Sequence, residues 1–216
     1  MSQHTYEYPR PALTADLIAL RWREGQLQVL LIKRSHDPFS GQWALPGGFV
    51  DGGESPVSAA ARELQEETGV SVDEESLIEI GAFGAPGRDP RGWTVSVAFV
   101  GLVSADVEAK AGDDAAEVKW ASWSAVCVGA EALAFDHQEI ITRAQTRLSE
   151  LTLTSPALLA LLGDRFRIRH ARHLYRQLTT RPISPRVFKA WLRKGDALER
   201  VGSALYRARR SIKLPW

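Results

Sequence analysis

The chain has 216 residues, of which 44% are hydrophobic, enough for one domain of fair size and a smaller second one. A single cysteine, Cys127, excludes an intrachain disulfide, and no stretch approaches the ~18 apolar residues of a membrane helix, so we expect a cytoplasmic protein. The net charge of +1 hides an asymmetry, because residues 1–140 carry 10 basic and 22 acidic side chains, whereas residues 141–216 carry 17 and 4.

Strand and helix signals alternate in the first part of the chain. Residues 13–20 and 26–33 are apolar runs separated by charged residues and a glycine, which predicts two paired strands. Ser55 and Pro56 suit the N-cap and the first turn of a helix, and Gly69 suits its end. Further strands are predicted at residues 77–83, 94–103 and 118–122.

A long helix with Asp136 as its N-cap is predicted next, because five apolar residues share one helical face: Ile140, Ile141, Ala144, Leu148 and Leu151. Strands with helices interspersed indicate an α/β or α+β sandwich. The character of the chain then changes. A joint at residues 152–156 is predicted to separate a domain of residues 1–150 from a domain of residues 151–216.

The second domain is expected to contain three short helices and a terminal hairpin. The helices are predicted at residues 156–162, 170–178 and 185–198, and the hairpin at residues 201–207. This order is the outline of a winged helix-turn-helix. The basic excess favours a polyanion such as double-stranded DNA as partner, and the alternative is attraction between two halves of opposite charge.

Three glutamates, Glu63, Glu66 and Glu67, are spaced i, i+3 and i+4, so a helix places their carboxylates on one face. Like charges so close together repel unless a cation binds them, and Mg²⁺ or Mn²⁺ prefers such oxygen ligands. The alternative is a solvated acidic face. The glycine pairs in residues 47–53 disfavour that alternative, since they let the backbone approach a ligand closely.

The sequence that begins at Gly48, GFVDGGESPVSAAARELQEETGV, resembles the Nudix box of the Nudix hydrolases. The matching residues are Gly48, Glu54, Arg62, Glu63, Leu64, Glu66, Glu67, Gly69 and Val70. The resemblance implies a Nudix sandwich fold and a site for Mg²⁺ or Mn²⁺. The implied metal ligands are the Gly48 carbonyl and the carboxylates of Glu63, Glu66 and Glu67.

The resemblance also implies catalytic roles. Glu63 and Glu66 act through the metal, and Arg62 with Glu54 fixes the loop against the helix; the alternative for that pair is a plain surface ion pair. A general base usually comes from outside the box. The candidates are Asp114 and Glu117, and the alternative for both is a solvated loop acid.

The loop of residues 83–93 bears on the substrate. Its Pro86 lies 16 residues past Val70, a placement that resembles ADP-ribose pyrophosphatases and implies ADP-ribose or a related nucleoside diphosphate derivative. The expected contacts are Arg88 and Arg91 to phosphates and Trp43 or Trp93 to adenine. The alternative is a Gly/Pro turn with solvent-facing arginines and tryptophans in the core.

A second resemblance covers nearly the whole chain. A Nudix domain followed by a winged helix is similar to the Nudix-related transcriptional regulators of NAD metabolism, with short supporting segments at residues 8–11, 134–137 and 205–207. In these regulators ADP-ribose is an effector, and many of their boxes are damaged. The box is intact here, so we expect hydrolysis. The alternatives are an ADP-ribose sensor with little turnover, and a hydrolase whose basic tail serves only dimerisation.

The best candidate for a DNA recognition helix opens at Ser184. Phe188, Trp191 and Leu192 share one face and are expected in its core. The side chains expected to contact DNA are Arg186, Lys189, Arg193 and Lys194 from this helix and Arg207 from the hairpin. A homodimer is also expected.

Overall fold

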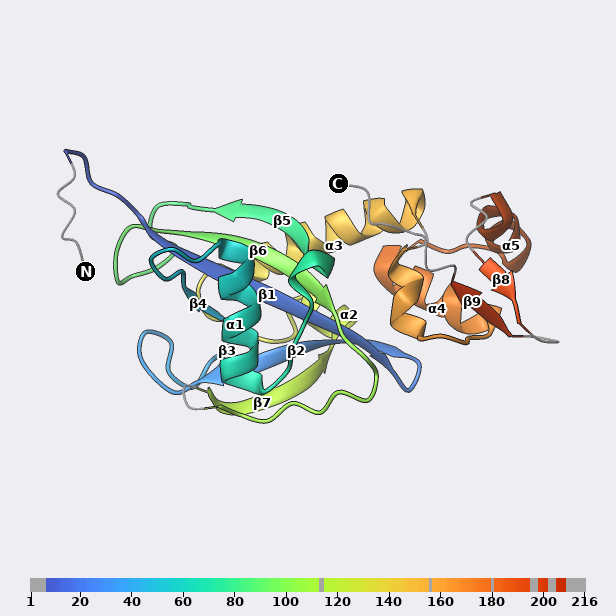
Figure 1. Ribbon diagram of the computed structural model, residues 1–216, viewed down its shortest axis with the longest axis horizontal. Helices are drawn as coiled ribbons and strands as arrows, with labels where there is room; N and C mark the ends of the chain where they lie inside the picture. Colours follow the sequence, from blue (N-terminus) through green and yellow to red (C-terminus); the bar gives the residue numbers. More distant parts are fainter. Residues whose placement is uncertain are drawn as a thin grey trace.

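A seven-stranded mixed sheet forms the centre of the larger part of the molecule (Figure 1). The structure, a computed structural model, describes residues 7–112, 115–155, 157–179, 181–194, 198–201 and 205–208. The strands are β1 (Ala12–Arg23), β2 (Gln26–Arg34), β3 (Trp43–Ala44), β4 (Gly47–Phe49), β5 (Ile78–Phe83), β6 (Thr94–Leu102) and β7 (Ala115–Ser122). The order is β3-β2-β1-β6-β5, with β4 also paired to β1 and β7 to β2.

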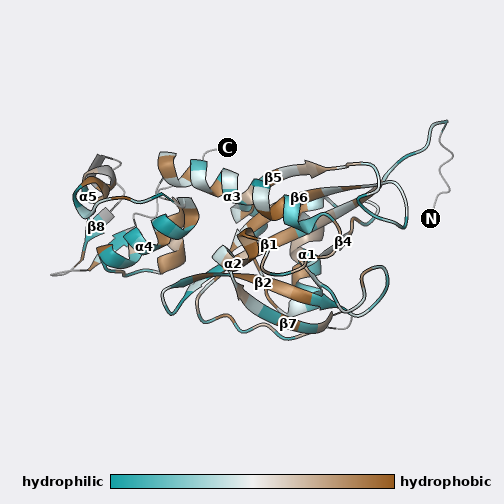
Figure 2. Ribbon diagram, turned by 180° about the vertical axis from the view of Figure 1, so that it is seen from behind, coloured by the Kyte–Doolittle hydropathy of each residue, from teal (hydrophilic) through white to brown (hydrophobic). Residues whose placement is uncertain are grey.

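Strand β1 is buried on both faces, because a helix covers each side of the sheet. Leu17 packs in a cluster with Leu64 of α1 (Pro56–Thr68), and Ile18 packs in another with Ile140 of α3 (His137–Thr154). This alternation follows from the two-residue period of a strand. Figure 2 shows hydrophobic residues along the central strands. Strands β1 and β6 pair in parallel, so the centre of the sheet is built from two segments far apart in sequence.

The predicted strands and the box helix are confirmed, with small shifts at their ends. The Ser55 hydroxyl accepts a hydrogen bond from the Ser58 amide at 3.1 Å, and Gly69 ends α1 with a φ of 68°. Two short helical segments were not predicted from the sequence, η1 (Glu74–Ser76) and α2 (Trp123–Cys127). Among the described residues, no helix is both long and apolar enough to cross a membrane.

Asp136 occupies the N-cap position of α3, as predicted. Its side chain makes no capping hydrogen bond. Both carboxylate oxygens instead accept hydrogen bonds from Arg88, at 2.8 and 2.7 Å. A charged, bidentate partner outcompetes a backbone amide for the same oxygens.

The C-terminal unit contains the expected series of short elements. They are η2 (Ala157–Leu162, a 3-10 helix), α4 (Ile168–Thr179), α5 (Pro185–Lys194), β8 (Leu198–Arg200) and β9 (Tyr206–Ala208). The helix predicted at residues 185–198 ends earlier, because Leu198 begins a strand; residues 195–197 lie outside the described part. Strands β8 and β9 form an antiparallel pair, and Tyr206 also bridges to Phe166.

Helix α3 continues past residue 151 into the predicted joint and ends within it, at Thr154. Leu158, Leu174 and Leu178 of the C-terminal unit belong to the same core cluster as the buried face of α3. Gln177 of α4 accepts a hydrogen bond from the Leu27 amide at 2.8 Å, which ties α4 to the start of β2. The acidic and basic parts of the chain, whose compositions differ, therefore pack against each other through a shared hydrophobic core.

We predict that Leu148→Ala will destabilise both parts of the molecule together. The Leu148 side chain is fully buried in the shared cluster, and removing a buried leucine costs about 2–5 kcal/mol. Urea denaturation followed by circular dichroism would measure the loss. Arg147→Ala, at a neighbouring side chain that is 41% exposed, should change stability by less than about 0.5 kcal/mol. Equal losses in the two variants would contradict the shared core.

Candidate functional site

The glycine loop of the box lies directly against the carboxylates of α1. The Gly47 amide donates a hydrogen bond to Glu67 at 2.9 Å, and Glu67 is buried. At Gly48 a β-carbon would collide with the Glu63 carboxylate. A side chain at residue 48 would therefore have to displace the Glu63 carboxylate.

Arg62 holds the acidic groups of the box together, as its resemblance to the Nudix arginine implies. Its guanidinium bonds Glu54 at 3.0 Å, Glu63 at 2.8 Å and Glu66 at 3.0 Å. It also donates to the Phe49 carbonyl of the loop at 3.0 Å. The hydrogen bond from Arg62 lowers the pKa of Glu54, whereas burial raises the pKa of Glu63.

The donor set fits a hard divalent cation. Glu63, Glu66 and Glu67 supply only carboxylate oxygens, and Glu63 lies directly against the backbone at Gly48. In the described part of the chain these carboxylates do not converge as a preformed metal cluster, since Arg62 and the Gly47 amide engage them. A cation would compete with Arg62 for the same oxygens and would favour the ionised form of Glu63.

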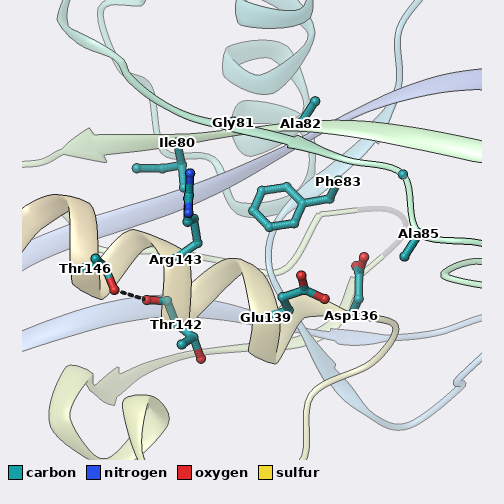
Figure 3. A pocket seen from close by; sticks show the side chains of 11 residues that line it. Ile80, Gly81, Ala82, Phe83, Ala85, Asp136, Glu139, Thr142, Arg143 and Thr146 are labelled. Atoms are coloured by element: carbon teal, nitrogen blue, oxygen red, sulfur yellow. Dashed lines mark hydrogen bonds between the residues drawn. The ribbon is translucent and has the colours of Figure 1, made fainter.

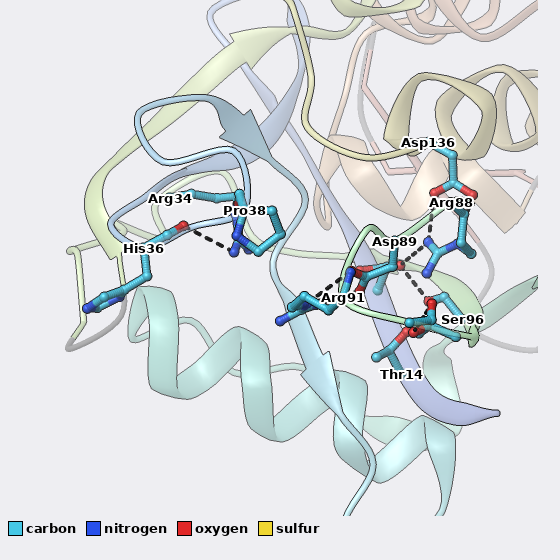
Figure 4. Close-up of polar contacts among 12 residues, drawn as sticks. Thr14, Arg34, His36, Pro38, Arg88, Asp89, Arg91, Ser96 and Asp136 are labelled. Carbon is cyan, nitrogen blue, oxygen red and sulfur yellow. Dashed lines mark hydrogen bonds and ion pairs between the residues drawn. The ribbon is translucent and has the colours of Figure 1, made fainter. Parts of the chain in front are cut away.

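A basic wall faces this acidic helix across a cleft. Two adjoining cavities, of about 330 and 80 Å³, share Arg34, Gly47, Gly48, Phe49 and Arg91 in their walls, and the larger also contains Glu63 and Glu67. The Arg34 and Arg91 guanidinium groups both lie over the Phe135 ring, at 4.8 and 5.6 Å from its centre. Figure 4 shows them with their carbonyl and carboxylate partners.

Arg34 was not predicted as a site residue. It donates to the Pro38 carbonyl at 2.7 Å and to the His36 carbonyl at 3.3 Å, and burial followed by repulsion from Arg91 lowers its pKa. A half-buried arginine beside a second arginine favours an anion. The signal in the sequence is its place as a basic residue at the end of an apolar strand.

Arg91 and Arg88 differ in their surroundings. Arg91 is half-exposed in the cleft and paired with Asp89 at 2.7 Å. Arg88 also lines the cleft, but its side chain is only 4% exposed and is held by Asp136 at 2.7 Å and near Asp16 at 3.6 Å. The buried acid Asp16 was missed, although a charge within the apolar run 13–20 could have indicated it.

The two tryptophans expected to stack on adenine lie outside the walls of both cavities. Lys119 covers the Trp43 ring at 4.0 Å from its centre, which occupies one stacking face. Trp93 is 58% exposed at the beginning of β6. Neither tryptophan is among the described residues that line the cleft, so their role as stacking residues stays a prediction.

Glu117, one of the two acids expected to supply a general base, is not among the described residues that line the cleft. Glu117 is exposed on β7 and pairs with Lys33 at 3.3 Å. Asp114 lies outside the described residues. Gly112 is packed against the backbone of Glu66 and Glu67, so the chain passes the end of α1 just before Asp114.

A larger cavity, of about 480 Å³, lies between β5 and α3 (Figure 3). Its wall includes Phe83, Glu139 and Arg143, and it is separate from the carboxylates of the box. Asp136 lines this cavity while its partner Arg88 lines the cleft, so their ion pair stands between the two spaces.

In the C-terminal unit, α5 has the two faces that were expected. Phe188 and Leu192 are buried, and Arg186 and Lys189 are exposed. Arg207 is half-buried on β9. The side chains of Trp191, Arg193 and Lys194 lie outside the described part.

A mixed α/β sandwich whose glycine loop and acidic helix adjoin an arginine-lined cleft defines the class of protein. The NUDIX domain family matches residues 11–144, and the chain belongs to the Nudix family.

Relatives extend the likeness over both parts of the chain. An ADPR responsive transcriptional repressor NtrR from Acinetobacter baylyi is 28% identical over 96% of this chain and 82% of its own length. An ADP-ribose pyrophosphatase from Methanocaldococcus jannaschii is 42% identical over 62% of this chain and 73% of its own length. The crystal structure of Shewanella oneidensis NrtR complexed with a 27mer DNA is similar with a TM-score of 0.73, 31% identity, and coverage of 91% and 93% of the two chains.

We predict that Gly48→Ala will weaken binding of Mn²⁺ roughly tenfold or more, because the new methyl group must displace the Glu63 carboxylate. Titration calorimetry with Mn²⁺ would measure the affinity. Gly52→Ala is the matched control, since a β-carbon there meets open space. Unchanged affinity in Gly48→Ala, with the protein folded, would show that this close contact does not shape a metal site.

Proposed function

We propose that this protein is a divalent-metal-dependent Nudix hydrolase that cleaves the diphosphate of ADP-ribose or a related nucleoside diphosphate derivative, with Mg²⁺ or Mn²⁺ as cofactor. The intact box, with its acidic helix opposite the arginines of one cleft, carries the proposal. The 42% identity to an ADP-ribose pyrophosphatase supports the substrate.

The chain supplies binding and orientation on both sides of the diphosphate. Arg34 and Arg91 bind phosphate oxygens from the basic wall, and the loop at Gly48 lets the backbone approach. Glu63, Glu66, Glu67 and the Gly48 carbonyl would hold a divalent ion, which would neutralise phosphate charge when bound. A carboxylate from outside the box, Asp114 or Glu117, takes the proton of the attacking water.

Glu66→Gln should lower kcat on ADP-ribose by about 10³-fold while the fold persists, because it removes charge from a proposed metal ligand. Glu66 is the most exposed of the three acids, with 59% of its side chain accessible, so the neutral amide is sterically tolerated. Release of AMP in the presence of Mg²⁺ is the measurement. The control is Gln65→Ala, at the exposed neighbouring position. A Glu66→Gln enzyme within tenfold of wild type would contradict the assignment.

A second function, transcriptional regulation with ADP-ribose as effector, is favoured by the likeness of the full chain to a repressor and to a DNA-bound regulator. We propose that residues 151–216 form a winged helix in which α5 enters the major groove and the β8–β9 pair is the wing. In a sensor with little turnover, ADP-ribose would reduce the affinity for DNA. A homodimer stays a prediction.

The double variant Arg186→Ala, Lys189→Ala should weaken DNA binding and flatten its salt dependence. Each lost phosphate contact reduces the slope of log affinity against log salt by about 0.9, so we expect a change of roughly two units. Fluorescence anisotropy with a mixed-sequence duplex, between about 50 and 200 mM salt, gives the slope. Lys110→Ala, an exposed cation of the acidic part, is the control. An unchanged slope in the double variant would place the DNA contacts elsewhere.

A further inference from the structure

A buried ion pair joins the cleft to the beginning of α3. Arg88 lines the cleft and Asp136 stands at the N-terminus of the helix, and they share two hydrogen bonds of 2.8 and 2.7 Å. The two side chains are only 4% and 14% exposed. A buried bidentate pair fixes the relative orientation of its partners, so a displacement of Arg88 acts on α3 (Figure 4).

His137, the next residue, joins α3 to the glycine loop. Its Nδ1 accepts a hydrogen bond from the Leu45 amide at 2.9 Å, and Leu45 precedes Pro46 and Gly47. A nitrogen that accepts holds no proton, so the neutral ring carries its proton on Nε2, which faces Asp16 at 3.6 Å. Burial lowers the pKa of His137 and favours this neutral form.

The turn before α3 is strained. Phe135 has a φ of 53°, in the left-handed region that bulky residues rarely adopt. Its ring lies 4.8 Å from Phe39 and 5.4 Å from His137, measured between ring centres. Such a conformation persists only while the surrounding contacts hold it, so loss of those contacts releases the turn.

The far end of α3 is embedded in the C-terminal unit. The buried residues Leu148 and Leu151 share a core cluster with Leu158 of η2 and Leu174 of α4. A close-packed helix without a break carries a shift at its N-terminus to the elements packed on its C-terminus.

We propose that Asp136 and His137 are positioning residues that couple occupancy of the cleft to the placement of the C-terminal unit. The inference rests on the proposed function in one respect, that the occupant is a nucleoside diphosphate derivative. Arg88 and the glycine loop line the same cleft, so such an anion would lie beside both, and the two groups are bonded to successive residues of one helix. Occupancy thus changes both contacts at once.

Hydrogen exchange of the full chain, read by mass spectrometry without ligand, tests the connection itself. Asp136→Asn and His137→Leu should each speed exchange roughly tenfold or more in residues 45–49 and also in residues 157–179. Exchange in β6 should stay at the wild-type rate. Unchanged exchange in residues 157–179, or an equal rise in β6 that marks global loosening, would overturn the proposal.

Two further variants separate coupling from a general effect on the helix. Glu139→Gln removes an exposed carboxylate from the same first turn and should leave both segments at wild-type rates. His137→Asn places an amide oxygen where Nδ1 accepts from Leu45, and should restore slow exchange. Fast exchange in His137→Asn equal to that of His137→Leu would contradict the role of this hydrogen bond.

A ligand arm distinguishes failure of this inference from failure of the proposed function. ADP-ribose with Mg²⁺ should protect residues 45–49 and change exchange in residues 157–179, and Asp136→Asn should keep the first effect and lose the second. A distal change that persists in both Asp136→Asn and His137→Leu would overturn the coupling. Lack of ADP-ribose binding by the wild type would contradict the proposed ligand, and the ligand-free comparison would still decide the coupling.

Discussion

The bonds that Arg62 makes with three carboxylates are the interaction on which the site depends. Glu54, Glu63 and Glu66 all lie within 3.0 Å of its guanidinium, which also holds the Phe49 carbonyl. Without the Arg62 guanidinium the carboxylates of α1 would repel one another, and the helix would lose this hydrogen bond to the loop. The loop, in turn, sets the floor of the cleft.

The loop is held from both faces of the sheet. Glu67 on α1 binds the Gly47 amide, and His137 on α3 binds the Leu45 amide. A cleft built this way cannot change shape without affecting a helix, and α3 is the helix that packs on the basic C-terminal unit. The repressor to which the whole chain is similar is described as responsive to ADP-ribose, which agrees with a link between the cleft and the C-terminal unit.

The acidic half of the site could be predicted from the sequence because its residues are local. The spacing of Glu63, Glu66 and Glu67 on one helix needs no tertiary information. The basic half could be predicted only in part: Arg88 and Arg91 were expected from the loop of residues 83–93, whereas Arg34 joins them only when the strands of the sheet pair. The ion pair of Asp136 with Arg88 could not be predicted either, since the two residues lie 48 positions apart in sequence.

The proposed reaction in this cleft is hydrolysis of a diphosphate. Phosphorus NMR of ADP-ribose with Mg²⁺ and the full-length protein in ¹⁸O-labelled water tests it directly. Hydrolysis predicts loss of the diphosphate signals and growth of two phosphomonoester signals, one of which carries the isotope shift of a single ¹⁸O atom. Persistent diphosphate signals, with ADP-ribose shown to be bound, would contradict the claim and favour a sensor.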